Sequence, residues 1–300
     1  MDNLPKIYKM SLDEQFYDLD TEQIGFFQKE TGIQSEELLK EHIIAVQTKA
    51  YLIYRYPCIR IFEFARLKMA RLPAYPDLLK LGRERNEAIF LDLACCFGND
   101  ARKAIQDGYP IDNVIASDIH KDFWDLGHEM FKSTPKSFPV PFVQGDIFDT
   151  NFLESTKPFT VESPPTKPVP ALNTLTSLNP LRGHLSACFC GAFFHLFGED
   201  AQKQIAEALA GLLSPEPGSM IFGVHGSRAV KGFWHPTGSE RYMFCHSPES
   251  WKDLWEGLFG KGNVEVKAQL RKEIGGDDLF GTYPGNKDPY HVMEWSVSRI

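Results

Sequence analysis

Two aspartates mark the part of the sequence whose side chains could bind a ligand. Asp92 lies in the apolar run AIFLDL at residues 88–93, and Asp118 follows the apolar run VIAS at residues 114–117. Between them, ACCFG at residues 94–98 has small side chains at alternate positions. Small residues let a backbone approach a ligand closely, and a carboxylate after the next strand can accept hydrogen bonds from both ribose hydroxyls. The pattern predicts a nucleoside-binding site.

The turn after the first apolar run helps to decide which nucleoside is bound. It is not a G-x-G-x-x-G turn, because only Gly98 is glycine, and no lysine follows as in a P-loop. The pyrophosphate of NAD would need those glycines and a free helix N-terminus. A carboxylate at Asp92 instead suits a ligand that carries an ammonium group. These residues favour S-adenosylmethionine over NAD.

The elements that must position the two aspartates form a β-α-β unit. A short run of apolar residues is typical of a strand covered on both faces. Residues 100–106 are compatible with a helix, which Gly108 and Pro110 would end. The second strand then ends at Asp118, which lies 118 − 92 = 26 residues after Asp92. This separation is close to the spacing that such a unit needs.

A third strand is predicted at residues 139–144, followed by Gly145-Asp146-Ile147-Phe148. Asp146 could accept the adenine amino hydrogens while Ile147 or Phe148 flanks the ring. The simpler alternative is that Asp146 only caps a helix. Its place after the third strand of this series favours the binding role.

The remaining periodic segments predict a Rossmann-like α/β fold. Later strands are expected at residues 185–190, 220–224, 264–270 and 291–297, and helices at residues 120–132, from about 199, and from 248. A Gly-Gly-Asp-Asp connection at 275–278 joins the last two strands. A terminal strand that returns antiparallel fits a seven-stranded, mostly parallel sheet.

The chain before the β-α-β unit is expected to be a helical extension. We divide the chain into an N-terminal helical region at residues 1–85 and a cofactor-binding domain at 86–300. Residues 35–50 predict one helix, and the aromatic, basic stretch 51–72 continues its apolar face. This region can be a cover packed on the core, a lid over the substrate, or both. The six prolines within residues 157–180 predict a long irregular insertion.

Composition excludes several classes of protein. The chain has 300 residues, 43% of them hydrophobic, and a net charge of −8 that argues against a nucleic-acid partner. No run has the length of a signal peptide core or a membrane span, so we expect a cytoplasmic protein. The six cysteines fit no disulfide framework and no CxxC pair, which indicates reduced thiols. The oligomeric state cannot be read from these features.

Five stretches together resemble a known family. They are LDLACCFGNDARKAIQDGYP, NVIASDIHKDFWDLGHEMF, PFVQGDIFD, FFHLFGEDAQ and HSPESWKDLW. In this order they resemble class I S-adenosylmethionine-dependent methyltransferases, and among these a fungal small-molecule family that includes terpenoid and meroterpenoid pathway enzymes. The resemblance runs from about Tyr51 to the C-terminus.

The resemblance implies a set of cofactor-binding residues. The methionine part would be surrounded by Asp92, Ala94, Cys96 and Gly98, and the ribose would be bound by Asp118 with its neighbour Ile119. The adenine would be held by Asp146 and Ile147, and the sulfonium would be bordered by Cys190 and Phe193. The family usually has glycine where this chain has Ala94. The extra methyl group could crowd the carboxylate of the cofactor.

Two histidines are candidate bases for the transfer. Methyl transfer mainly requires alignment of a nucleophile with the methyl group, although a hydroxyl acceptor also benefits from a base. His195, just past the fourth strand, is the first candidate, and His225, after the fifth, is the second. Either can instead be structural. A zinc site built from the cysteines is disfavoured by their spacing, so no metal is expected.

The sequence therefore predicts an O-methyltransferase that acts on a hydroxyl or carboxylate of an apolar small molecule, expected to be a fungal secondary metabolite. The apolar pocket would be formed by the aromatic N-terminal region and the Phe-rich stretch 189–197. The N-P-P-Y signature of N-methyltransferases is absent. Two alternatives stay open: a non-methylating binder or cyclase on the same fold, and an NAD-dependent oxidoreductase.

Overall fold

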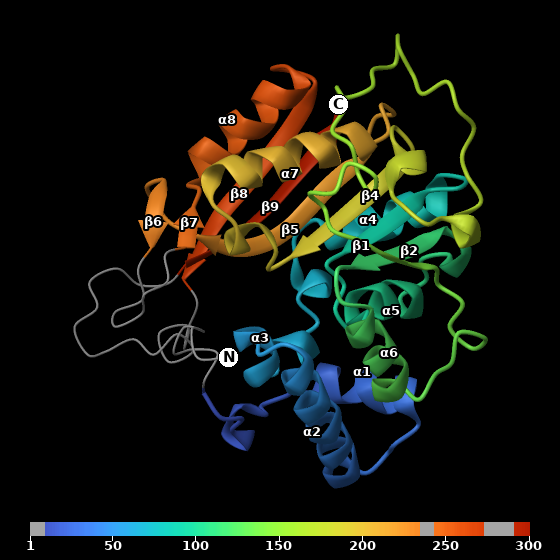
Figure 1. The fold of residues 1–300 in the computed structure, drawn as a ribbon, viewed down its shortest axis with the longest axis vertical. Coiled ribbons are helices and arrows are strands. Elements are labelled where there is room, and N and C mark those ends of the chain that lie inside the picture. Colours follow the sequence, from blue (N-terminus) through green and yellow to red (C-terminus); the bar gives the residue numbers. More distant parts are fainter. Residues whose placement is uncertain (1–9, 235–242, 273–290) are drawn as a thin grey trace.

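A single sheet organises the part of the chain that the computed structural model describes, residues 10–234, 243–272 and 291–300. Within these ranges seven strands pair in the order β3-β2-β1-β4-β5-β9-β8 (Figure 1). Their bounds are β1 Ile89–Leu93, β2 Val114–Asp118, β3 Phe142–Gln144, β4 Leu185–Gly191, β5 Met220–Ser227, β8 Val264–Lys272 and β9 His291–Arg299. The first five run parallel, and β9 pairs antiparallel with both β5 and β8. The predicted fold class is confirmed.

The central strands are apolar because both of their faces are covered. All residues of β1 are buried, and Leu91 faces one core cluster while Phe90 faces another. Helices α7 (Glu199–Leu212) and α8 (Pro248–Phe259) cover the first face. Helices α4 (Tyr75–Glu84), α5 (Asn99–Gln106) and α6 (Lys121–Met130) contribute to the second. The carboxyl ends of the parallel strands lie together at one edge of the sheet, which is where ligands bind in open α/β sheets.

The N-terminal region packs into a third core cluster. Its helices are α1 (Thr21–Thr31), α2 (Glu36–Ile53) and α3 (Pro57–Arg60), with short 3-10 turns η2 (Glu14–Phe16) and η3 (Glu63–Ala65). The next 3-10 turn, η4 (Met69–Arg71), packs through Met69 into the second cluster instead. Ser35 caps α2 as predicted, because its side chain accepts a hydrogen bond from the Leu38 amide. The division into two domains stays a prediction.

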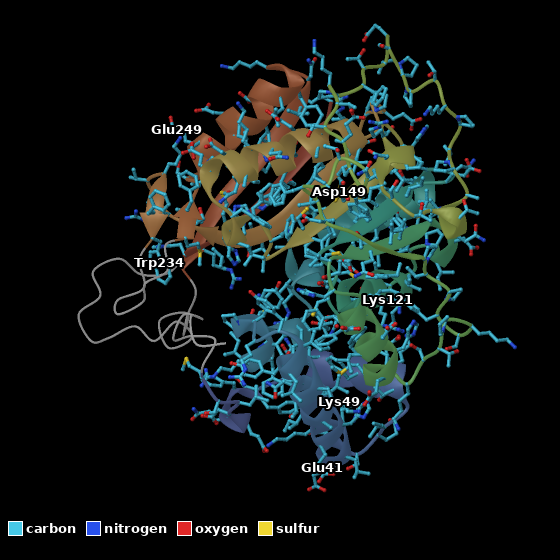
Figure 2. All side chains as sticks on the ribbon, viewed as in Figure 1. Glu41, Lys49, Lys121, Asp149, Trp234 and Glu249 are labelled. Carbon is cyan, nitrogen blue, oxygen red and sulfur yellow. The ribbon has the colours of Figure 1, made fainter. Side chains whose placement is uncertain are left out.

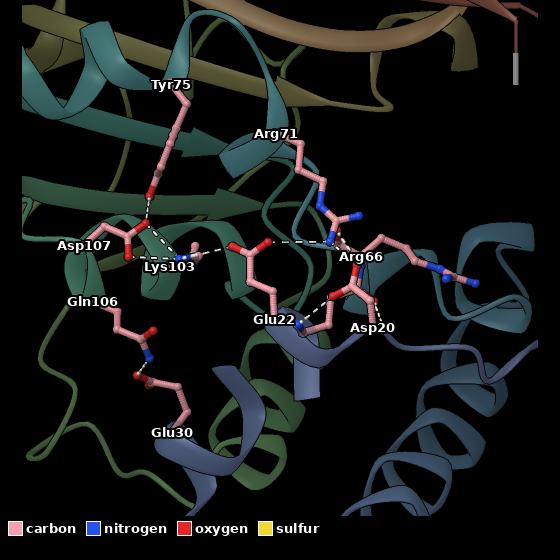
Figure 3. A network of polar contacts seen from close by, with 10 residues as sticks. Asp20, Glu22, Glu30, Arg66, Arg71, Tyr75, Lys103, Gln106 and Asp107 are labelled. Atoms are coloured by element: carbon pink, nitrogen blue, oxygen red, sulfur yellow. Dashed lines mark hydrogen bonds and ion pairs between the residues drawn. The ribbon is translucent and has the colours of Figure 1, made fainter. Parts of the chain in front are cut away.

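Polar contacts join this region to α5 (Figure 3). The Lys103 ammonium group lies 3.7 Å from the Glu22 carboxylate and 2.9 Å from that of Asp107. The Tyr75 hydroxyl donates to Asp107 at 2.7 Å, and the Gln106 amide donates to Glu30 at 3.0 Å. Helix α1 is thus fixed to the helix that follows the predicted ligand-binding turn.

Several segments differ from the sequence-based prediction. The stretch 51–72 is interrupted at Pro57, where α3 begins, and continues as two 3-10 turns in which little regular helix remains; Phe62 and Leu67 have left-handed φ angles of 58° and 50°. Helices α1 and α4 lie in the region expected to be helical but were not predicted individually, and the hairpin of β6 (Gly232–Trp234) and β7 (Met243–Cys245) was not predicted. The connection at 275–278 lies outside the described residues.

Residues 157–180, predicted to be an irregular insertion, contain little regular secondary structure. Their described backbone contains only short 3-10 turns, η6 (Leu172–Thr174) and η7 (Asn179–Leu181), and an isolated bridge between Thr160 and Ser163. Further along, the 3-10 turn η8 (Phe194–Leu196) connects β4 to α7. None of the helices in the described ranges has the length and apolar character needed to cross a membrane.

Candidate cofactor and acceptor site

The turn between β1 and α5 has an unusual backbone. Ala94, Cys96 and Gly98 all have left-handed φ angles, at 56°, 50° and 72°. The turn is held by two backbone bonds, from the Cys95 amide to the Ser117 carbonyl at 3.1 Å and from the Gly98 amide to the Cys95 carbonyl at 2.8 Å. Left-handed backbone costs about 1–2 kcal/mol for a residue other than glycine, so two such residues in one turn need support from their surroundings.

Gly98 is required by its neighbour as well as by its backbone angle. A Cβ at this position would lie 2.6 Å from the ring of Trp124 in α6. The close packing of α6 on the turn therefore requires glycine here. Ala94, Cys96 and Gly98, the small residues noted at alternate positions in the sequence, are the residues of the turn that have left-handed φ angles.

Asp118 ends β2 and faces this turn. Its carboxylate accepts hydrogen bonds from the Cys96 amide and the His120 amide, both at 2.9 Å. Burial raises the pKa of the Asp118 carboxyl above its usual range, and the two amides oppose that shift. The first and second strands are thereby tied together through the group predicted to bind ribose.

Asp92 lies inside β1, and its carboxylate points toward the start of α5. It is 2% exposed and accepts a hydrogen bond from the Ala101 amide at 3.1 Å. Burial, followed by the charge of Asp100, raises the pKa of Asp92 well above its usual range. Within residues 10–234, 243–272 and 291–300, no cationic side chain is paired with this carboxylate, which makes the site electrostatically suited to a cation.

Asp100 is a third acidic group that sequence reasoning missed. Its carboxylate accepts a hydrogen bond from the Met69 amide at 3.2 Å. Burial raises the pKa of Asp100 to about 6, against the opposing effects of that amide and of Lys68. In the sequence, an aspartate in the first turn of a helix is an ordinary feature, so no local signal separates Asp100 from a helix-stabilising residue.

The loop after β3 holds the predicted adenine residues. The Asp146 side chain is exposed and accepts a hydrogen bond from the Phe148 amide at 3.0 Å, while Ile147 is buried. Ile119, after β2, is 49% exposed, and its carbonyl accepts a hydrogen bond from the Gln144 side chain at 3.0 Å. Asp146 thus stabilises its own turn and caps no helix, and its exposed carboxylate can accept further hydrogen bonds.

The end of β4 brings thiols and aromatic rings to the same edge. The Cys190 sulfur is buried 3.9 Å from that of Cys188. Burial raises the pKa of the Cys190 thiol well above its usual range. The Phe197 ring lies 5.2 Å from the rings of both Phe193 and Phe148. The loops after β3 and β4 are therefore joined by aromatic contacts.

His195 lies in η8, where its ring faces the end of β5. Its Nδ1 accepts a hydrogen bond from the Gly226 amide at 3.0 Å. An Nδ1 that accepts a bond carries no proton, so the proton of the neutral ring is on Nε2. In this state Nδ1 is occupied by the Gly226 hydrogen bond and Nε2 already carries a proton, so neither nitrogen is ready to take a proton from the methyl acceptor.

His225 is not after the fifth strand, as predicted, but within β5, where it pairs with Met293 of β9. It is 2% exposed, and its Nδ1 accepts a hydrogen bond from the Trp295 indole at 2.9 Å. Burial, and then the nearby His195 and His246, lower the pKa of His225 well below its usual range. These contacts make His225 a neutral, packed imidazole.

Comparisons with known proteins decide the relationship. A family model described as the meroterpenoid methyltransferase N-terminal domain matches residues 11–65. O-methyltransferase atr3 of Stereocaulon alpinum is 29% identical over 259 residues, which are 86% of this chain and 67% of that protein. O-methyltransferase phiE of Fungal sp. (strain ATCC 74256) is 27% identical over 86% of this chain and 78% of its own. The Asnovolin E/Chermesin D methyltransferase nvfJ of Aspergillus novofumigatus is 29% identical over 83% and 78%.

The chain is related to fungal secondary-metabolite methyltransferases. The resemblance predicted from the five sequence stretches is thus confirmed, and these methyltransferase relatives support S-adenosylmethionine as the cofactor. The family model begins at residue 11, so it also covers an N-terminal segment that the sequence-based resemblance, starting near Tyr51, did not include.

The described residues of the chain fit that cofactor. S-adenosylmethionine carries a sulfonium and an ammonium group, and three carboxylates with raised pKa values lie around the turn: Asp92, Asp100 and Asp118. Among the residues that the structure describes, no group of three or more His, Cys, Asp or Glu is arranged to hold a metal ion. Figure 2 labels Trp234, the last residue of β6, and Asp149, in the loop that follows β3.

Proposed function

We propose that this chain transfers the methyl group of S-adenosylmethionine to an oxygen of an apolar small molecule. The observation that carries the proposal is the acidic character of the turn. Asp92, Asp100 and Asp118 would attract the cationic methyl donor, whereas the pyrophosphate of NAD would add negative charge to the same place. This charge argument disfavours the oxidoreductase alternative.

In the proposed complex each part of the cofactor has its own residues. Asp92, Ala94, Cys96 and Gly98 surround the methionine part; Asp118 and Ile119 bind the ribose; Asp146 and Ile147 bind the adenine; and Cys190 and Phe193 border the sulfonium. When bound, S-adenosylmethionine supplies an electrophilic methyl group. The residues of the chain align that group with the acceptor and exclude water from both.

An oxygen acceptor is supported by the names of two relatives, O-methyltransferases atr3 and phiE. Within that class, the geometry of His195 favours a carboxylate over a hydroxyl. Its Nδ1 already accepts the Gly226 amide bond, so the ring is poorly placed to remove a hydroxyl proton. A carboxylate is ionised at neutral pH and needs no base. We keep His195 as a residue that borders the acceptor and do not assign the buried His225 to the reaction.

The cofactor half of the proposal is tested by ligand-induced stabilisation. A ligand at 100 times its Kd stabilises a protein by about 2.7 kcal/mol, so melting temperatures with S-adenosylmethionine, S-adenosylhomocysteine and NAD separate the candidates. We expect the first two to raise the melting temperature and NAD to leave it unchanged. Stabilisation by NAD alone would overturn the assignment.

The transfer half is tested with a methyl donor labelled at its methyl carbon. The protein is incubated with a panel of apolar carboxylic acids and phenols, and products are analysed by mass spectrometry. Alkaline hydrolysis releases labelled methanol from a methyl ester but not from an aryl ether, so the acceptor oxygen is identified directly. Binding of the donor without transfer to any acceptor in the panel would favour the non-methylating binder or cyclase. Cytoplasmic localisation stays a prediction.

A further inference from the structure

The ring of Phe97, in the middle of the cofactor turn, does not pack in the core of the sheet. It is fully buried in the cluster formed by the N-terminal helices. Its nearest aromatic partner is Phe64 of η3, with ring centroids 4.9 Å apart at 76°. Phe123 of α6 lies on another side at 5.8 Å. The turn that begins in the sheet is therefore completed by a side chain anchored in the N-terminal region.

His120, two residues after Asp118, is also held by aromatic contacts with the N-terminal region. The His120 ring lies 5.6 Å from that of Tyr54 and 6.2 Å from that of Tyr56. Tyr56 also lies 6.1 Å from the ring of Phe123. Residues 54–64, which run from the end of α2 into η3, thus contact both chain segments that face the ribose-binding carboxylate. We call residues 54–64 the bridging segment.

The two anchored segments supply the two hydrogen bonds that orient Asp118. One comes from the amide of Cys96, next to Phe97, and the other from the amide of His120, each at 2.9 Å. Cys96 holds a left-handed backbone without being glycine. Such a conformation persists only where surrounding contacts fix it. The aromatic contacts of the bridging segment add to the two backbone hydrogen bonds of the turn in meeting this need.

We propose that the bridging segment is a positioning element of the cofactor site. Phe64 fixes the turn through Phe97, and Tyr54 and Tyr56 fix His120, so the N-terminal region sets the affinity for the cofactor. This inference rests on the proposed function for the identity of the ligand. It differs from a lid over the acceptor, because the contacts reach the cofactor turn and the Asp118 backbone donors.

The test compares Phe64→Leu and Tyr56→Leu with a matched control, Phe27→Leu. Phe27 belongs to the same core cluster but stacks on Phe131, with centroids 5.5 Å apart at 5°, at the far end of α6 from His120. Edge-to-face pairs contribute about 0.5–1.5 kcal/mol, so each bridging variant should weaken S-adenosylmethionine binding roughly 2- to 10-fold in calorimetry. The control should lower the melting temperature without weakening binding. Tyr56→Phe, which keeps the ring, should bind like the wild type.

A second measurement needs no ligand. In Phe64→Leu, hydrogen–deuterium exchange should accelerate in peptides that contain the Cys96 amide. In Tyr56→Leu, it should accelerate in peptides that contain the His120 amide, and in Phe27→Leu it should accelerate in neither. Normal exchange and normal affinity in both bridging variants would overturn the inference. Equal loss of affinity in the control would also overturn it, since the effect would then be one of general stability. If the wild-type protein binds neither S-adenosylmethionine nor its demethylated product, the proposed function fails, and the exchange data still decide the positioning role.

Discussion

Asp100 offers a prediction whose size can be worked out from the structure. Burial raises its pKa to about 6, whereas an aspartate in an unfolded chain has a pKa of about 3.9. Between these values the folded protein binds more protons than the unfolded chain, so the contribution of Asp100 to stability is lost as pH rises through this window. Above it, the folded state contains an ionised carboxylate that burial disfavours.

Replacing Asp100 with asparagine removes this cost and keeps an acceptor for the Met69 amide. From the two pKa values, Asp100→Asn should stabilise the fold by roughly 1–2 kcal/mol at pH 5 and by roughly 3 kcal/mol at pH 8. In domains of 150–250 residues, 1 kcal/mol shifts the melting temperature by roughly 2–4 °C, so the effect at pH 8 is several degrees. The unfolding free energy is measured by urea denaturation at pH 5, 6, 7 and 8.

The control is Asp112→Asn, which changes an exposed carboxylate in the 3-10 turn η5 (Ile111–Asn113) before β2. As a surface substitution away from the turn, it should change the free energy of unfolding by no more than about 0.5 kcal/mol. A difference for Asp100→Asn that stays constant with pH, or a variant less stable than the wild type at pH 8, would refute the reasoning. Asp100→Asn should also weaken the binding of S-adenosylmethionine more than that of S-adenosylhomocysteine, whose sulfur is uncharged, because the substitution removes negative charge from the site.

Three further predictions concern the predicted site residues. Asp118→Asn should weaken cofactor binding by about 1–3 kcal/mol in calorimetry, since it spoils charge-assisted hydrogen bonds; unchanged affinity would remove Asp118 from the ribose site. Ala94→Gly should bind S-adenosylmethionine at least as tightly, because glycine relieves the left-handed backbone and removes a methyl group; a large loss with the fold intact would show that the alanine is accommodated. His195→Asn keeps an acceptor for the Gly226 amide and should lose far less turnover than the roughly 10²- to 10⁴-fold typical of a lost base; a loss of that size would restore the base role.

The sheet and the turn could be predicted because their signals are local. The strand that contains Asp92 and the strand that ends at Asp118 are apolar on both faces, and small residues alternate through the turn between β1 and α5. Neighbouring residues therefore suffice to predict both strands, the turn and the two carboxylates. The bounds of these strands agree with the prediction within a residue. The ligand class follows as well, since it depends on the chemistry of the same short stretches.

The tautomers of the two histidines could not be predicted in this way. The bond to His195 comes from Gly226, 31 residues later, and the bond to His225 comes from Trp295, 70 residues later. Both depend on which strands become neighbours in the sheet. The left-handed residue Phe62 likewise has no turn signal of glycine or asparagine, so the path of the bridging segment is set by tertiary packing.

The acidic turn and its N-terminal support have a common physical cause. Buried carboxylates and left-handed residues both cost stability in the protein without its ligand, and neither is needed to form the sheet. Strain of this kind is maintained where a bound ligand compensates it. A cationic ligand offsets the charge of Asp92 and Asp100, and the aromatic contacts of the bridging segment hold the turn in the shape that receives it. Cofactor affinity and stability are therefore expected to change in opposite directions when these carboxylates are neutralised.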